Sequence, residues 1–207
     1  MREEETQKFW NSLLTERSWQ LLQELRRMYE FVLIGGWAVY LHTRQQKSKD
    51  IDIVVSLSQL EKLKKAGIGK NDKLKKYELR RDEIDVDIYV EHYSELGIPV
   101  EEIRKRAIDI EGFSVVQAEV LLILKQVAHK AREFSVKGEK DLLDIIGLLL
   151  YGRVNFKKYE NLLEAYGLGG YQAALKKAVS NFRRNELLGL NAPDFKRKKG
   201  EILKRMG

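Results

Sequence analysis

The pattern of apolar residues begins with a long helical stripe over residues 3–29. Apolar side chains recur there at three- and four-residue intervals, as on the buried face of an amphipathic helix. The stripe consists of Phe9, Trp10, Leu13, Leu14, Leu21, Leu22, Leu25 and Met28. A polar interruption near Thr15–Ser18 predicts that the segment is divided into two helices.

Two short apolar runs follow, separated by a pair of glycines and a polar loop. Residues 31–34 predict a buried strand, which Gly35 and Gly36 interrupt. Helical spacing then resumes from Gly36 to about Leu41. A second buried strand is predicted over residues 50–55, so the pattern here is strand, turn, helix, loop and strand.

A β-hairpin is predicted farther along the chain. Leu74–Arg80 and Ile84–Val90 have the composition of strands, and Arg81–Glu83 forms the tight turn between them. In the second strand every other residue is apolar and faces the core. Asp85 and Asp87 therefore share the opposite face.

Shorter signals fill the rest of the first half. Ser58 is the expected N-cap of a helix over Gln59–Lys65. Pro99 is a favourable first residue for a short helix that extends through Arg106. Ile108–Val116 predicts a second hairpin, which turns at Glu111–Gly112.

From Gln117 onward the pattern is helical to the end of the chain. Apolar stripes predict one helix after Gln117, another after Gly138 and a third capped by Asn155. The glycine-rich turn at 166–170 leads into a fourth helix, and a basic helix follows Asn191. These elements predict a helical bundle without internal repeats.

The elements together predict an α+β protein with two domains. Residues 1–112 would form the catalytic domain with its N-terminal helices, and residues 113–207 a helical bundle with a basic tail. No apolar run is long enough to cross a membrane, and Met1–Glu5 does not have the chemistry of a secretory signal. The chain has no cysteine, which excludes disulfides, thiol catalysis and cysteine-bound zinc. We therefore expect a cytoplasmic protein without a membrane partner.

Positive charge is concentrated at the C-terminal end of the chain, whose formal net charge is +7. The basic residues there are Lys176, Lys177, Arg183, Arg184, Lys196, Arg197, Lys198, Lys199, Lys204 and Arg205. Such a run is either a solvated surface or a surface that follows the phosphates of RNA. The pattern alone leaves both interpretations open.

Candidate chemistry lies in the strand-turn-helix segment and the strand after it. Asp50 and Asp52 project from one strand face, with backbones roughly 7 Å apart at the usual rise per residue. Two carboxylates so placed suit hard divalent cations, and Mg²⁺ is the usual ion beside nucleotide phosphates. Gly35 and Gly36 let a phosphate approach the backbone N–H groups. Each feature alone is common, since a Gly-Gly turn predicts little and Asp-x-Asp is usually a solvated strand end.

The conjunction of Gly35-Gly36 with Asp50-Ile51-Asp52 resembles the signature of the DNA polymerase β-like nucleotidyltransferase superfamily. The resemblance implies a nucleotidyltransferase-fold mixed sheet flanked by helices and followed by a helical C-terminal domain. It also implies transfer of a nucleoside monophosphate from an NTP such as ATP to a hydroxyl, with release of pyrophosphate. Asp50 and Asp52 would hold Mg²⁺ or Mn²⁺, and the two glycines would receive the β- and γ-phosphates.

The resemblance further implies a third carboxylate on a neighbouring strand. Two metal ions need more anionic ligands than one Asp-x-Asp supplies. Asp85 and Asp87 both satisfy the spacing, and both are candidate metal ligands. Asp87 is favoured as the catalytic residue because the apolar run Ile88–Val90 follows it, as in relatives. The alternative is that both aspartates are merely exposed.

Two lysines are candidate nucleotide-binding residues. Lys49 lies in a basic loop before the first aspartate, where it would either meet a triphosphate or be solvated. Lys125 lies on an apolar helical stripe, where an uncompensated charge is costly. With Asp141 and Asp144 it resembles a pattern in abortive-infection toxin-type and other small bacterial and archaeal nucleotidyltransferases. Lys125 would form an ion pair with these aspartates or face the nucleotide.

Three function classes follow from these features. The first is a nucleotidyltransferase that acts on RNA, such as tRNA, or on a protein, in the manner of a toxin with an antitoxin partner; the basic tail favours it. The second modifies a small hydroxyl compound such as an antibiotic, because Gly-Gly-Trp37 resembles that branch. The third is a non-catalytic module that binds nucleic acid or a partner, against which the three carboxylates argue.

Overall fold

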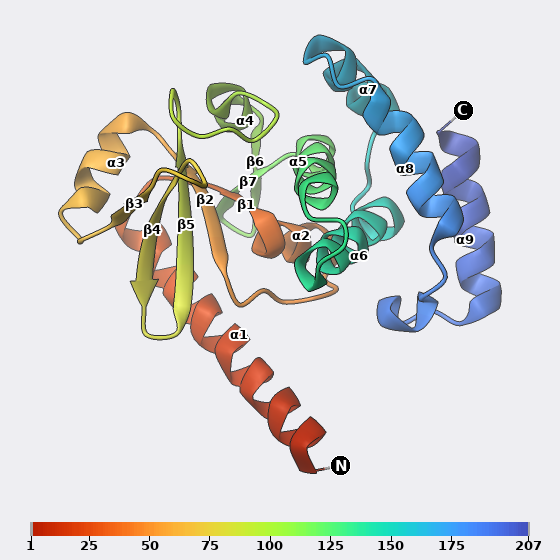
Figure 1. Cartoon of the computed structure of the whole chain (residues 1–207), viewed down its shortest axis with the longest axis horizontal. Helices are drawn as coiled ribbons and strands as arrows, with labels where there is room; N and C mark the ends of the chain where they lie inside the picture. Colours follow the sequence, from red (N-terminus) through yellow and green to blue (C-terminus); the bar gives the residue numbers. More distant parts are fainter. Residues whose placement is uncertain (1, 207) are drawn as a thin grey trace. The chain divides into compact units, whose positions relative to one another are not determined.

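The structure, a computed structural model, describes residues 2–206, with side chains from Trp10 onward (Figure 1). Phe9 of the predicted stripe lies outside the described side chains. The chain forms two compact units, the first of residues 1–40 and 46–116 and the second of residues 41–45 and 117–207. The chain thus passes from sheet to helices after Val116, beyond the expected domain boundary at residue 113. The reason is that Phe113–Val116 pairs with the sheet as a strand.

One mixed sheet organises the first unit. Its strands are β1 (Val32–Ile34), β2 (Ile51–Val55), β3 (Gly69–Asn71), β4 (Lys76–Arg81), β5 (Ile84–Val90), β6 (Ala107–Ile110) and β7 (Phe113–Val116). Their spatial order is β3-β4-β5-β2-β1-β7-β6. The pairs β2/β5 and β1/β7 are parallel, and the other neighbours are antiparallel.

The alternation predicted for Ile84–Val90 is confirmed, since its apolar residues are buried and Asp85 is exposed. In β2, Ile51 and Ile53 are fully buried. The buried faces of the parallel strands β2 and β5 contribute to the core of the unit. The opposite side carries Asp52 and Asp87.

The helices of the first unit are α1 (Arg2–Met28), α2 (Gly35–Thr43), α3 (Leu57–Lys64) and α4 (Val100–Lys105). The predicted break near Thr15–Ser18 is wrong, because α1 is continuous there. Its polar side chains are satisfied without ending the helix: Thr15 Oγ1 donates to Ser12 O at 2.9 Å, and the buried Ser18 Oγ accepts from Trp37 Nε1 at 2.8 Å.

Two helices begin two or three residues earlier than predicted. Ser56, not Ser58, caps α3, because its extended backbone lets Ser56 Oγ accept from Gln59 N. Ser58 instead shares a hydrogen bond of 2.9 Å with the Ser56 hydroxyl. Helix α6 likewise begins before Gly138, with Ser135 as its N-cap.

The second unit is helical. It contains α5 (Ala118–Ala131), α6 (Val136–Tyr151), α7 (Phe156–Ala165), α8 (Gly170–Asn181), the short 3₁₀ helix η1 (Asn185–Leu188) and α9 (Ala192–Arg205). Asn155 caps α7 as predicted, and α5 packs against α6, α7 and α8. The predicted fold class is therefore confirmed: an α+β protein with a mixed sheet flanked by helices and a helical C-terminal part. Among the described helices, none is long and apolar enough to cross a membrane.

Candidate active site

Three carboxylates lie side by side on the sheet of the first unit. Asp52 of β2 is the register partner of Asp87 of β5, and Asp87 is also the register partner of Glu78 of β4. Register partners on neighbouring strands point their side chains to the same face. We call Asp52, Asp87 and Glu78 the acid row.

Gly35 makes room for one end of the acid row. It lies where β1 ends and α2 begins, with a φ of +66°. A Cβ at this position would lie 2.0 Å from Asp52 Oδ2, which is far inside van der Waals contact. The first glycine therefore places the N-terminus of α2 directly against the Asp52 carboxylate, and Gly36 is buried beside it.

Lys76 neutralises the other end of the acid row. Its ammonium group lies 2.6 Å from Asp87 Oδ2 and 3.0 Å from Glu78 Oε1. Lys76 is only 9% exposed, and its contact with Asp87 is the more sheltered of the two, because the Glu78 side chain is 44% exposed. Glu78 also accepts a hydrogen bond of 2.9 Å from Asn71 Nδ2.

The like charges of the acid row affect its titration. Burial raises the pKa of Asp87 to about 6, and the charge of Asp52 adds to the rise while Lys76 opposes it. Hydrogen bonds from Lys76 and Asn71 lower the pKa of Glu78. Burial alone would lower the pKa of Lys76, but the hydrogen bonds and charges of Asp87 and Glu78 raise it overall.

The other two predicted carboxylates lie apart from these contacts. Asp50 is half-buried and immediately precedes β2, two residues before Asp52. The Asp85 side chain is 59% exposed and lies 3.7 Å from Arg80 Nε. Among the side chains that the structure describes, from Trp10 onward, no group of three or more acidic or histidine residues is arranged to hold a metal ion by itself. The structure thus brings Asp52 and Asp87 together and leaves Asp85 at the surface.

The candidate nucleotide-binding lysines have partners in their own units. Lys49 Nζ donates to Asn11 Oδ1 of α1, in the same unit. Lys125 is buried in the second unit, where its Nζ lies 3.3 Å from Asp141 Oδ1 and 2.7 Å from Asp144 Oδ2. Of the two roles open to Lys125, the structure shows the ion pair. A nucleotide contact by either lysine stays a prediction.

Lys76 and Glu78 were missed by the sequence interpretation. Both lie in the predicted strand Leu74–Arg80, which begins two residues later in the structure, at Lys76. Their alternation around Tyr77 was the available signal, because it places both on one strand face. The partner strand and its register, which bring them to Asp87, could not be inferred from that alternation.

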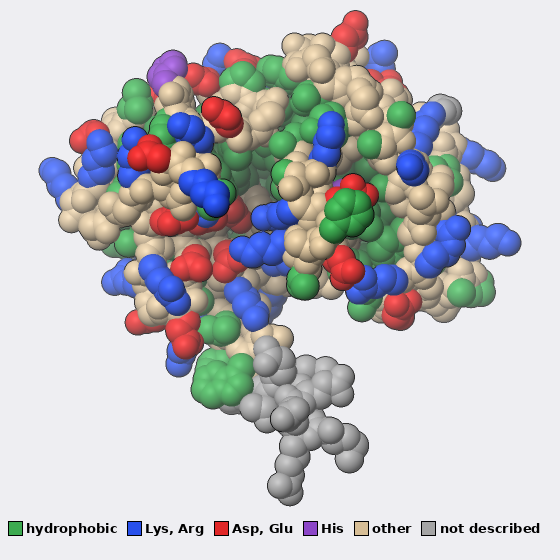
Figure 2. Space-filling view, in the orientation of Figure 1, with side chains coloured by type: hydrophobic (Ala, Val, Ile, Leu, Met, Phe, Trp, Pro, Cys, Tyr) green, Lys and Arg blue, Asp and Glu red, His purple; other side chains and the backbone are tan. Residues whose placement is uncertain are grey.

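The basic tail is a packed helix with one charged side. Phe195, Ile202 and Met206 are buried, whereas Lys196 and Lys204 are exposed. Figure 2 shows Lys and Arg side chains at many points over α8 and α9. The charged surface predicted for this segment therefore exists, although it covers only one side of α9.

Several tail cations also stabilise the second unit. Lys199 Nζ donates to Ser180 O at 2.7 Å and to Phe182 O at 3.2 Å, at the end of α8. Arg197 pairs with Glu201 at 3.0 Å along α9. These two cations are partly committed to the helices, unlike exposed lysines such as Lys196.

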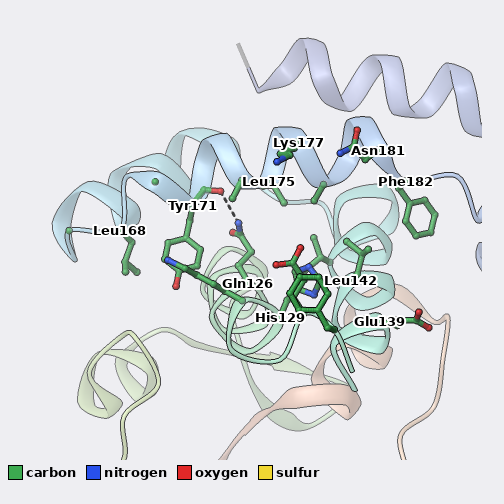
Figure 3. Close-up of a pocket in the computed structure, with 18 residues that line it drawn as sticks. Gln126, His129, Glu139, Leu142, Leu168, Tyr171, Leu175, Lys177, Asn181 and Phe182 are labelled. Carbon is green, nitrogen blue, oxygen red and sulfur yellow. Dashed lines mark hydrogen bonds between the residues drawn. The ribbon is translucent and has the colours of Figure 1, made fainter. Parts of the chain in front are cut away.

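A pocket of about 770 Å³ lies among α5, α6 and α8 of the second unit (Figure 3). Gln126 on its wall donates to Tyr171 O at 2.9 Å and accepts from Tyr159 Oη at 2.6 Å. His129 Nδ1 shares a hydrogen bond of 2.9 Å with Gly138 O. Apolar side chains line much of the remainder: Leu142, Leu168, Leu175 and Phe182. Gln126 and His129 thus serve to join the helices around the pocket.

Neither a protein-family profile nor a curated protein matches the chain. Among solved structures, JHP933 from Helicobacter pylori is 19% identical with a TM-score of 0.47, and the match covers 97% of this chain and 90% of that one. An antigenic nucleotidyltransferase-like protein from Paracoccidioides brasiliensis is 17% identical over 90% of this chain and 92% of that one, with a TM-score of 0.41. A further nucleotidyltransferase-like protein of H. pylori is 17% identical over 94% and 93%, with a TM-score of 0.48.

Proposed function

We propose that the acid row binds a divalent cation together with an NTP, and that the protein transfers the nucleoside monophosphate to a hydroxyl acceptor. The observation that carries the proposal is the register pair Asp52–Asp87 beside the glycine turn at Gly35. A helix N-terminus favours phosphate through its free N–H groups and its dipole. Carboxylates and a phosphate-binding turn are thus adjacent on one unit.

The acid row fits Mg²⁺ or Mn²⁺. Mg²⁺ is usually held by one or two carboxylates together with substrate phosphates and waters, rather than by a complete protein cage. Asp52 and Asp87 supply two such carboxylates, and the raised pKa of Asp87 reflects burial and a repulsion that a cation would relieve. The bound cation would neutralise charge on the phosphates. Asp50, two residues before Asp52, would contribute to the same site once the nucleotide is bound.

In the proposed reaction the acceptor oxygen attacks the α-phosphorus of the NTP. A P–O bond forms, the bond to the β-phosphate oxygen breaks, and pyrophosphate leaves with its electron pair. Asp87 accepts the proton of the acceptor hydroxyl, because with a pKa of about 6 or lower this carboxylate is ionised at neutral pH. Gly35 and Gly36 present backbone N–H groups to the β- and γ-phosphates. Catalysis then depends chiefly on positioning and charge neutralisation.

RNA is the proposed acceptor, because the exposed lysines of α8 and α9 form a cationic surface that suits a phosphate backbone. A toxin-like role would require that the added nucleotide inactivate the acceptor, for example a tRNA. A protein or a small hydroxyl compound would not need this surface.

Labelling tests the activity directly. The protein would be incubated with each α-³²P-labelled NTP, Mg²⁺ or Mn²⁺, and either total RNA, total protein or a panel of hydroxyl compounds. We expect label in RNA with one NTP and none with Asp52→Asn. Label in protein or in a small compound would change the acceptor, and absence of transfer to every acceptor would contradict the proposed activity.

A further inference from the structure

Phe134 is a large apolar side chain that the fold leaves entirely in water. It lies in the turn between α5 and α6, and its exposure is 100%. Val136, two residues farther along, is 85% exposed. Single apolar residues are common at protein surfaces, but a pair of them beside an apolar pocket is typical of an interaction site. Burial of Phe134 therefore adds nothing to the stability of the unit that carries it.

Hydrogen bonds hold the turn that presents Phe134. Ser135 donates to Arg132 O through its backbone N at 3.0 Å and through its Oγ at 2.8 Å. Ser135 Oγ also accepts from Gly138 N at 3.1 Å. A Cβ at Gly138 would lie 2.1 Å from Arg132 O, so glycine lets the turn close tightly against α6. A side chain on such an ordered turn loses little conformational freedom when a partner binds it.

Phe134 borders the pocket of about 770 Å³ in the same unit. The wall of this pocket is apolar over much of its area, with Leu142 on α6, Leu175 on α8 and Phe182 at the end of α8 (Figure 3). Its volume is ample for an aromatic side chain. Because the exposed ring and the pocket lie next to each other, two copies related by a twofold axis can each place Phe134 in the pocket of the other. Such reciprocal contacts define an isologous interface.

The charged residues around the pocket favour a second copy of the chain over RNA. The pocket is lined by two cations and two anions, all exposed: Lys130, Lys177, Glu133 and Glu139. Glu139 also lies 3.2 Å from Arg184. A surface with both signs can face itself so that opposite charges meet, whereas a phosphate backbone would meet the carboxylates as well. Lys177 also belongs to the cationic surface proposed for RNA, so the two surfaces meet on α8.

We propose that this chain forms a dimer of identical subunits in which Phe134 of each copy inserts into the pocket of the other. The inference is independent of the proposed reaction, because its residues all belong to the second unit and none to the acid row. Phe134 is the aromatic anchor of the interface, since buried aromatic side chains contribute much of the binding free energy at such contacts. Two pockets and two rings bury a small area, so the dimer should form at micromolar rather than nanomolar concentration.

Sedimentation velocity of the full chain from about 1 to 300 μM tests the proposal. We expect a monomer–dimer equilibrium in the wild type. Phe134→Ser should raise the Kd of the dimer at least about tenfold, and Phe134→Leu should raise it less because an apolar side chain remains. Both variants should stay folded, as circular dichroism would check, because the Phe134 side chain is fully exposed in the single chain. Leu74→Ser is the matched control, since Leu74 is 56% exposed in the first unit.

A second variant blocks the pocket instead of removing the ring. Ala174→Glu places a charged side chain on the α8 wall of the pocket and keeps a good helix former there, so it should weaken self-association as Phe134→Ser does. Neither variant can make the proposed contact with itself. A mixture of the two can make one of the two reciprocal contacts. With a fluorescent label on one variant, mixed dimers should therefore be tighter than dimers of either variant alone.

Several results would overturn the inference. A wild-type chain that stays monomeric over the whole range would do so, and so would a dimer that Phe134→Ser leaves unchanged, because its contact would then lie elsewhere. Mixed dimers no tighter than the separate variants would show that the contact is not reciprocal. If the wild type is monomeric and Phe134→Ser lowers affinity for RNA, the pocket serves RNA instead. Transfer of labelled nucleotide is measured separately, so the proposed function can stand or fail whatever the oligomeric state.

Discussion

The carboxylate of Asp52 occupies the space that a side chain at position 35 would need. Gly35 has a φ of +66°, and a Cβ built on it lies 2.0 Å from Asp52 Oδ2. The glycine turn and the first strand aspartate are therefore one structural unit, although a helix and a loop separate them in the sequence. Substitutions at position 35 should therefore act on Asp52 of the proposed metal site through this contact.

Gly35→Ala should both destabilise the protein and impair Mn²⁺ binding. A non-glycine residue with left-handed backbone costs about 1–2 kcal/mol, and displacement of Asp52 adds to this cost. Gly67→Ala is the matched control, because Gly67 has a φ of +82° and no atom within 4 Å of its Cβ position. Urea unfolding and Mn²⁺ titration would compare the two variants. Equal losses of stability, with metal binding unchanged in both, would contradict the proposed contact.

The aspartates should differ in their effects on nucleotidyl transfer. Asp50→Asn and Asp52→Asn should each abolish transfer, and Asp87→Asn should lower kcat by about 100-fold or more, since metal ligands and their supports have effects of this size. Asp85→Asn should change kcat by less than about twofold, because Asp85 is exposed and faces Arg80. Initial rates with a fixed NTP and acceptor would measure this. A larger loss with Asp85→Asn than with Asp87→Asn would reverse the assignment.

Mn²⁺ affinity should fall as the pH decreases through about 6. The pKa of Asp87 is raised to about 6, so below that pH a proton competes with the cation for the same carboxylate. The Kd should then approach about a tenfold rise per pH unit. In Asp52→Asn the pKa of Asp87 should fall, because one like charge has been removed. Carboxyl NMR shifts of Asp87 would report this even if the variant binds no metal.

The Asp87 carboxylate should make the metal-free protein less stable at neutral than at acidic pH. The folded-state pKa of Asp87 lies above its unfolded value, so its contribution is fully present below about pH 4 and is lost as the pH rises through about 6. Asp87→Asn should therefore gain up to about 3 kcal/mol relative to wild type between pH 4 and pH 7. Urea unfolding at several pH values, with Asp85→Asn as control, would measure the difference. A constant difference between wild type and Asp87→Asn would show that Asp87 does not titrate in this range.

Lys125→Met should destabilise the helical unit by about 3–5 kcal/mol, because it leaves the buried Asp144 without the cation that pairs with it, whereas Asp141 keeps its contact with Arg132 at 2.7 Å. Lys137→Met, at an exposed position of α6, should change stability by less than about 0.5 kcal/mol. Thermal and urea unfolding would measure both. If Lys125→Met instead remains stable and loses affinity for the NTP, Lys125 faces the nucleotide rather than serving in the ion pair.

RNA binding should weaken steeply with salt and depend on the exposed lysines. Neutralising Lys177, Lys196 and Lys204 to Gln should reduce the slope of log K against log[salt] by about one for each RNA phosphate that a lysine no longer neutralises. NTP binding at the acid row should not change. Lys199→Gln is a contrasting variant, because Lys199 caps α8 and its removal should lower stability. Identical weak salt curves for wild type and triple variant would favour a protein or small-molecule acceptor.

Local patterns in the sequence were sufficient for the elements and for the motif that links them. Alternation in Ile84–Val90 is a property of one strand, so the faces of Asp85 and Asp87 could be predicted without the fold. The same holds for the helical stripes of the second half and the Asn155 cap. Local signals failed where two residues could serve equally, as with Ser56 and Ser58, because both hydroxyls can cap a helix and only the backbone geometry selects one.

The tertiary structure decided which strands are neighbours and in what register. Asp87 lies beside Asp52 because β5 pairs with β2 in parallel, although β3 and β4 separate them in the chain. Asp85 lies on the same strand face as Asp87 and also fits the spacing expected of a third carboxylate. Position in the sequence alone therefore could not distinguish the two. Pairing between β4 and β5 brings Lys76 and Glu78 to Asp87. Strand order and register depend on burial of whole faces by distant segments, and those long-range contacts leave no signal in any single stretch of sequence.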